Sequence, residues 1–155
     1  MRRMIAIAVM CLFVLGSSLP IQAQNPGFNK LSASISGTTL SVTFKLTGLG
    51  DATTVAVTLS DDVSFTCTSH GQGGTVTTSA HQTLNETTTF TVGPKPGTSS
   101  GTVSFTPDCP GSQKVGGPVV FSNVSISASA TTGTAGPVAI TNVNGVFVCS
   151  NLTNC

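Results

Sequence analysis

The sequence predicts an all-β protein, an antiparallel β-sandwich of about eight or nine short strands. After the first two dozen residues, apolar and polar side chains alternate with a period of two in many places, and helical periodicity occurs nowhere. Turn signals recur at about the eight-to-twelve-residue spacing that is typical of sandwiches and barrels. Because 39% of the residues are apolar and alternate, we expect this weakly charged chain to fold rather than to be disordered.

The clearest hairpin comes first in the chain and is joined by a turn at Gly37-Thr38. Residues 24–29, which precede it, are expected to form a short irregular segment. Asp61-Asp62 interrupts the next alternating run, so a turn is predicted there. The strands predicted in the first half of the chain are residues 31–35, 40–46, 55–59 and 63–67.

Two long loops are predicted in the middle of the chain, a glycine-rich one at residues 69–74 and another at residues 108–113. Alternation slips near Asn123, as a β-bulge in one long strand requires. A Gly/Thr loop is expected at residues 131–137, and Asn144-Gly145 is a strong two-residue hairpin signal. The strands predicted in this half are residues 75–79, 88–92, 103–105, 119–128, 138–140 and 146–148.

Phenylalanines are expected to supply much of the core, at roughly 1.5 to 3 kcal/mol for each buried ring. An exposed aromatic binding face is the alternative, but the rings alternate regularly with serine and threonine. Five of them occupy inward positions of the predicted strands: Phe44, Phe65, Phe90, Phe105 and Phe121.

The N-terminal pattern predicts a secretory signal peptide over residues 1–23. Arg2 and Arg3 precede an apolar run that ends at Leu15, and a small-residue stretch leads to a cleavage site after Ala23. The run is shorter than the roughly 20 apolar residues of a membrane span. We therefore expect residues 24–155 to be one β-sandwich domain, secreted to the extracellular space or the periplasm, and we favour a bacterial leader.

Charge is scarce in the expected mature chain, because cleavage removes both arginines and leaves four lysines against five carboxylates. The lysines are scattered and form no basic stripe that could neutralise phosphates. We therefore expect no nucleic-acid partner and no membrane partner after cleavage. The lysines are Lys30, Lys45, Lys95 and Lys114.

Four cysteines remain once Cys11 is lost with the leader, which predicts two disulfides with three possible connectivities. Cys67 and Cys109 lie at the two long loops, and Cys149 and Cys155 are close in sequence, so we favour these two pairs. Metal binding by the thiols is the alternative, but no C-x-x-C spacing occurs.

Several segments together resemble small secreted bacterial β-rich proteins of unknown function. They are residues 31–45, Gly48-Leu49-Gly50, a cysteine before a glycine-rich loop, Cys109-Pro110-Gly111-Ser112-Gln113 and Phe121-Ser122-Asn123-Val124. The match covers about residues 31–128, in the range of one domain. The resemblance supports the pairing of Cys67 with Cys109, since that group carries cysteines in the same two loops, and it implies no activity.

Catalytic signals are few, and we expect no enzyme. A hydrolase needs a nucleophile with an oriented base, or two carboxylates facing a cleft. Ser69-His70 are sequence neighbours that point apart in an extended chain, and no G-x-S-x-G motif occurs. Asp61 and Glu86 are an alternative glycosidase-like pair, but turn aspartates and a solvated glutamate explain them more simply.

Ligand binding is the alternative to a structural role, and its candidate residues lie in the two long loops. They are His70, Gln72, Asp108 and Gln113. The absence of tryptophan and tyrosine weakens a carbohydrate platform. Calcium held by Asp51, Asp61 and Asp62 lacks a recognisable loop motif, and His70 with His81 lack a third ligand. We expect neither a metal nor a cofactor.

The expected function is a non-catalytic extracellular one, in surface or matrix interaction or in assembly. Few charges protect the strand edges, so strand addition to a second copy or to another extracellular protein is feasible. A carbohydrate-dependent or calcium-dependent ligand-binding module is the alternative, with a glycan as partner.

Overall fold

The computed structural model describes residues 25–71, 73–143 and 146–149. The predicted signal peptide, Gln72 and the predicted turn at Asn144-Gly145 lie outside the described residues. Cys155 does as well, and with it the predicted pairing of Cys149.

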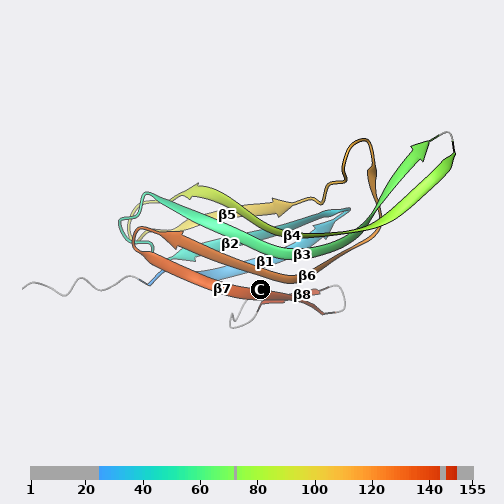
Figure 1. The fold of residues 1–155 in the computed structure, drawn as a ribbon. Coiled ribbons are helices and arrows are strands. Elements are labelled where there is room, and N and C mark those ends of the chain that lie inside the picture. The colour runs from blue at the N-terminus through green and yellow to red at the C-terminus, as the bar shows by residue number, and fades with distance from the viewer. Residues whose placement is uncertain (1–24, 72, 144–145, 150–155) are drawn as a thin grey trace, which may run out of the picture.

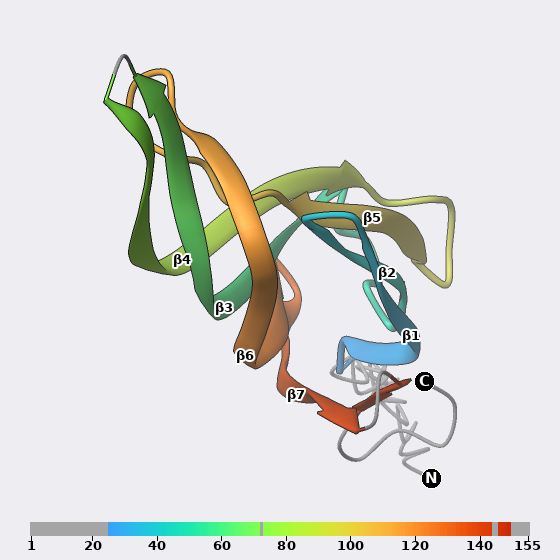
Figure 2. The ribbon, with the colours of Figure 1, turned by 90° about the vertical axis from the view of Figure 1, so that its right-hand side faces the viewer.

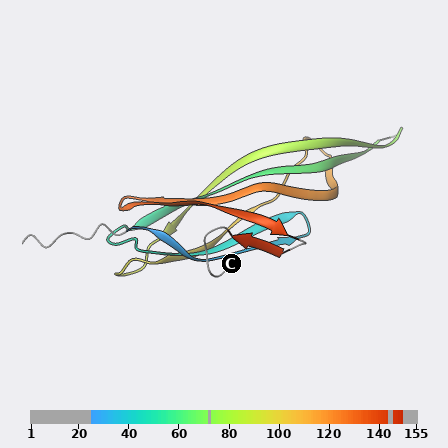
Figure 3. The ribbon, with the colours of Figure 1, turned by 90° about the horizontal axis from the view of Figure 1, so that it is seen from below.

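All strands in the described part of the chain are antiparallel and form two sheets that pack face to face around one core (Figure 1). The smaller sheet has the order β1-β2-β5 and the larger has the order β4-β3-β6-β7-β8. Figure 3 shows the two layers from below. The strands are β1 (Gly27–Ser36), β2 (Thr39–Thr47), β3 (Thr54–Gly71), β4 (Gly74–Thr91), β5 (Ser99–Phe105), β6 (Lys114–Ala130), β7 (Gly133–Val143) and β8 (Val146–Cys149).

The prediction of a helix-free antiparallel fold is confirmed, and so is the first hairpin, in which Leu31 lies opposite Phe44. The irregular segment predicted at residues 24–29 is wrong in part, because β1 begins at Gly27 and Phe28 is buried. The ring of Phe28 lies edge-on to that of Phe44, which explains why this short stretch is held in the sheet.

The turn predicted at Asp61-Asp62 is wrong, because both residues lie in the middle of the 18-residue strand β3. β4 pairs with β3 along its whole length without a shift in register, and β6 pairs with it on the other side. Hydrogen bonds from two neighbours keep this stretch extended, so they outweigh the local turn preference of aspartate.

Two predicted loops are also shorter than expected. β3 continues to Gly71 and β4 starts at Gly74, directly opposite it, so most of the loop at residues 69–74 is strand. The loop expected at residues 131–137 is strand β7 from Gly133 onward, where Gly133 lies opposite Ala130. In both places glycine and threonine sit in paired strands, because a neighbouring strand supplies the hydrogen bonds.

The β-bulge predicted near Asn123 is confirmed. The register of β6 against β3 shifts between Ser60 and Asp62, and Asn123 has a φ of 54°, in the left-handed region. Asparagine tolerates this conformation better than most residues do. The bulge brings the Asn123 amide within 2.8 Å of an Asp62 carboxylate oxygen, to which it donates a hydrogen bond.

The core lies between the sheets and contains the inward side chains of both. Phe44, Phe65 and Phe121 are buried as predicted, and Phe90 and Phe105 are partly buried against the same core. The fully buried aliphatic side chains include Leu31, Leu40, Val42, Leu46, Leu49, Val55, Val57, Leu59, Val63, Val103 and Ile126.

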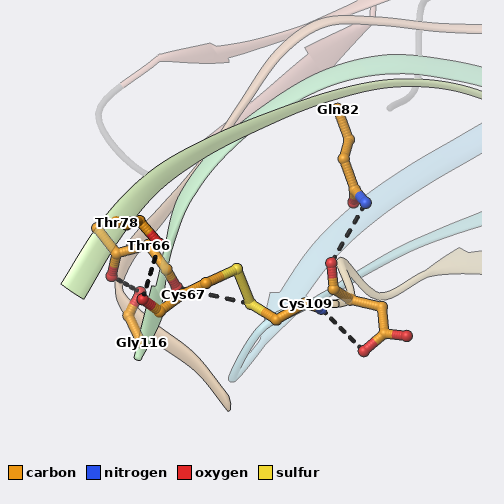
Figure 4. Close-up of a disulfide and its surroundings, with 7 residues drawn as sticks. Thr66, Cys67, Thr78, Gln82, Cys109 and Gly116 are labelled. Carbon is orange, nitrogen blue, oxygen red and sulfur yellow. Dashed lines mark hydrogen bonds between the residues drawn. A yellow bond between two sulfur atoms is a disulfide. The ribbon is translucent and has the colours of Figure 1, made fainter. Parts of the chain in front are cut away.

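A disulfide joins Cys67 of β3 to Cys109, as the sequence predicts (Figure 4). It fastens the loop between β5 and β6 to the larger sheet across 42 residues of sequence. Loop-closure entropy gives such a crosslink a stabilisation of about 4 kcal/mol. The Gln82 amide donates a hydrogen bond to the Asp108 carbonyl oxygen at 3.2 Å, so β4 holds the same loop.

The end of the β3–β4 hairpin extends beyond the smaller sheet, and both strands are strongly twisted (Figures 1 and 2). At its other end β4 swings toward β5 (Figure 2). There Phe90 lies edge-on to Phe44, with ring centroids 4.8 Å apart, and covers Gly101.

Gly101 is expected to tolerate no side chain, because a Cβ there would collide with the ring of Phe90. Overpacking of this kind costs about 1 to 3 kcal/mol. We predict that Gly101→Ala lowers the free energy of unfolding by that amount in urea titrations, and that Phe90→Leu in the same chain recovers part of the loss. Gly27→Ala is the matched control, since nothing lies within 4 Å of the position that its new Cβ would take. Equal stabilities of the two alanine variants would contradict the prediction.

Candidate functional site

The predicted ligand residues do not form one site among the described residues. His70 lies near the end of β3 and is exposed, Asp108 is exposed in the loop between β5 and β6, and Gln113 is half-buried just before β6. No hydrogen bond or ion pair joins any two of these three in the described part of the chain. Asp108 instead accepts a hydrogen bond from the backbone N–H of Cys109, which shapes its own loop.

The metal sites considered from the sequence do not assemble either. His81 lies opposite Ser64, and His70 lies six residues farther along β3, which separates the two histidines by about 20 Å. Asp61 and Asp62 point to opposite faces of the sheet, and Asp51 forms an exposed ion pair with Lys95. Across the described ranges, no group of three or more histidine, cysteine, aspartate or glutamate side chains is placed to hold a metal ion.

Among the described strands, the outer edge of β4 is the longest strand edge whose backbone groups have no neighbouring strand. Val92 donates its backbone N–H to the Thr53 carbonyl oxygen, and the ladder from there to the hairpin tip has no register shift. Even-numbered residues of β4 therefore bond to β3, and odd-numbered residues direct their N–H and C=O groups away from it. In the part of the chain that the structure describes, no hydrogen bond reaches these outward groups between residues 75 and 89.

Only the last part of this edge is covered. The Ser99 hydroxyl donates to the Thr91 carbonyl oxygen, and the Gly93 N–H donates to the Thr98 carbonyl oxygen. The start of β5 thus protects β4 at and beyond Thr91. We call residues 75–89 of β4 the free edge.

The free edge lacks the usual protection against strand addition. It carries no lysine and no proline, its ladder with β3 has no bulge, and Glu86 is its one acidic residue. Its outward side chains are mostly threonine, which has a high strand propensity. A second strand therefore meets little charge or steric resistance here, although β4 is strongly twisted.

A shallow depression of about 380 Å³ lies on the outer face of the larger sheet, beside the free edge. Its lining is mostly apolar, and Val120 in it is 55% exposed. Ser64 and His81 border it on neighbouring strands. The lining residues are Ser64, Phe65, Thr66, Ser79, Ala80, His81, Pro118 and Val120.

Ser64, His81 and the nearby Asp62 have the residue types of a nucleophile triad but not its geometry. Among the described residues, no hydrogen bond joins His81 to either of the others, so Ser64 has no aligned base. Asp62 instead accepts hydrogen bonds from Asn123 and from Thr83, which together lower its pKa. The cluster fixes the β-bulge, and no chemical step follows from it.

Asp61 is the unusual buried residue of the larger sheet. It is 3% exposed and points inward from β3 between Leu59 and Val63, opposite Leu84 of β4. Neither of its carboxyl oxygens has a hydrogen-bond partner in the structure. Burial raises the pKa of Asp61 from 3.8 to about 6, and the neighbouring Asp62 carboxylate adds to this rise. Relative to the unfolded chain, folding therefore shifts Asp61 toward the protonated form.

Sequence reasoning missed both the burial of Asp61 and the free edge of β4. Asp61 has the same parity as Leu59 and Val63, so an uninterrupted strand would have placed it in the core. The free edge had no such signal, because it depends on which strands become neighbours.

Comparison with protein-family models, with curated proteins and with solved structures finds no match for this chain. Within the described ranges, no helix has the length and hydrophobicity needed to cross a membrane.

Ionisation of Asp61 is expected to destabilise the fold as the pH rises. Because its folded pKa lies above the unfolded value, its contribution is fully present below pH 4 and is lost as the pH passes through about 6. We predict that wild type loses on the order of 2 kcal/mol of unfolding free energy between pH 4 and pH 8 relative to Asp61→Leu. Urea titrations across this range measure the difference.

Asp62→Asn is the matched control for this prediction. The pKa of Asp62 is lowered, so its own contribution changes below pH 4, outside the window in which Asp61 titrates. Asp62→Asn should keep most of the loss between pH 4 and pH 8, because burial is the larger cause of the raised Asp61 pKa and the Asp62 charge is the smaller one. Parallel stability curves for wild type and Asp61→Leu would show that folding does not raise the pKa of Asp61.

Proposed function

We propose that this chain is a secreted, non-catalytic protein of immunoglobulin-like sandwich architecture that acts by strand addition. Its expected location is the extracellular space or the periplasm of a bacterium, in keeping with the resemblance to small secreted bacterial proteins. There it joins surface or matrix components, or assembles with copies of itself. The observation that carries the proposal is the free edge of β4.

Strand addition suits this edge physically. A partner strand gains main-chain hydrogen bonds to the outward N–H and C=O groups, and side chains on alternating faces supply specificity. The free edge runs from Thr75 to Thr89 without a covering segment in the described structure. Its hydroxyl side chains accept or donate hydrogen bonds without a charge that must be desolvated.

Two further observations support an extracellular, structural role. The Cys67–Cys109 disulfide fits an oxidising compartment, to which the N-terminal leader would direct the chain. The polar cluster around Asp62 is consistent with a structural role, because this carboxylate accepts hydrogen bonds from Asn123 and Thr83 and orients no base for a nucleophile.

We predict that purified protein associates as its concentration rises, and that Thr83→Lys abolishes the association. Thr83 has its side chain on the outer face, where it donates a hydrogen bond to Asp62, and its backbone groups on the free edge. A lysine there removes that hydrogen bond and places a charge beside each incoming strand. Light scattering across a concentration series measures the mass.

Ser34→Lys is the matched control, because it adds the same charge to an exposed position of another outer strand, β1. We expect its mass to follow that of wild type. A wild-type mass of one chain at all concentrations would overturn assembly, and titrations with glycans and calcium would then test the ligand-binding alternative.

A further inference from the structure

We infer that the partner at the free edge is a second copy of this chain, paired β4 to β4 in antiparallel orientation about a two-fold axis through Gln82. The inference rests on the proposed function, because it specifies which strand is added and in which register. It predicts a closed dimer with one continuous sheet across both copies.

Closure follows from the symmetry of the pairing. β5 is bonded to β4 at its start, and β1 contacts both β7 and β8 on the other side of the sandwich. Among the described strands the free edge is the longest stretch without a neighbouring strand. Shorter unpaired stretches are the outer sides of β1 and β5 and residues 114–124 of β6. When the same edge of two copies pairs, it is consumed in both, so growth ends at two chains.

The register follows from overlap and from sheet geometry. A two-fold axis perpendicular to the sheet keeps inner faces next to inner faces, so each residue meets a partner residue of the same parity. The free edge spans residues 75–89, and its midpoint is Gln82. Only the register centred on Gln82 pairs every outward N–H and C=O group of the free edge.

Side chains match in this register. On the inner face Ala80 lies opposite Leu84 of the second copy, and both are half-buried hydrophobics that pack against the core on either side of Gln82. Their contact would shield apolar surface that one copy leaves partly exposed. Glu86 meets Thr78, so the two glutamates of the dimer avoid each other.

The outer face matches as well. His81 lies opposite Thr83 of the second copy, and the remaining outer positions bring hydroxyl and amide side chains together. Such pairs already occur between strands of one chain, as in Thr58 and Thr87, whose hydroxyl oxygens are 2.8 Å apart. The interface therefore continues a pattern that the larger sheet uses internally.

Cysteine crosslinking tests the register. Gln82 is the residue that faces its own copy, and as an even-numbered residue it forms a non-hydrogen-bonded pair, in which side chains are closest. We expect Gln82→Cys to form a disulfide-linked dimer under mild oxidation, seen on a non-reducing gel and absent from wild type. The linked peptides are identified by mass spectrometry, which separates this bond from those of the native cysteines.

Ala80→Cys and Leu84→Cys are the matched controls. Neither faces its own copy, so each alone should stay unlinked, whereas a mixture of the two variants should form the mixed dimer. This pattern, with a limiting mass of two chains by light scattering, is the result expected.

Other outcomes overturn the inference in different ways. A wild-type dimer without links at Gln82, or with Leu84 linked to itself, would disprove the register while leaving strand addition in place. Growth beyond two chains would disprove closure. A single-chain mass without links at any position would overturn the inference and self-assembly together, and would leave strand addition to surface or matrix components as the proposed function.

Discussion

The two-sided pairing of β3 is the constraint on which the rest of this fold depends. β4 follows it without a register shift on one side, and β6 follows it on the other. Because both neighbours fix its phase, alternate side chains of β3 enter the core with few exceptions. The same phase directs Cys67 to the disulfide and Asp61 to the interior, and it leaves the far side of β4 without a partner.

Local patterns predicted the parts of the fold that local physics decides. The first hairpin, the inward phenylalanines and the bulge at Asn123 each follow from alternation or from a turn preference within a few residues. The lengths of β3 and β4 were predicted wrongly, because these strands contain aspartates and glycines that favour turns. Their extension depends on hydrogen bonds from strands distant in sequence, which no short window of residues reveals.

The candidate site was predicted less well for the same reason. Loop composition directed attention to His70, Asp108 and Gln113, which the structure leaves apart from one another. The free edge of β4 becomes visible only when the sheet order is known, because the same threonine-rich strand would be fully paired at the centre of a sheet. Whether a strand lies at the edge of a sheet depends on its neighbours, whereas its composition depends on its own residues alone.

Neutral hydroxyl pairs are frequent among the side-chain contacts on the outer faces of the described sheets, and Asp62 is a charged exception. Cross-strand pairs join Thr39 to Thr106, Ser41 to Ser104 and Thr43 to Thr102, whereas Lys95 and Asp51 form the one ion pair of the described chain, and it is exposed. Dissolved salt screens charges but leaves such neutral pairs nearly unaffected. We therefore expect the contacts between these outer strands to change little as the ionic strength of the solution rises.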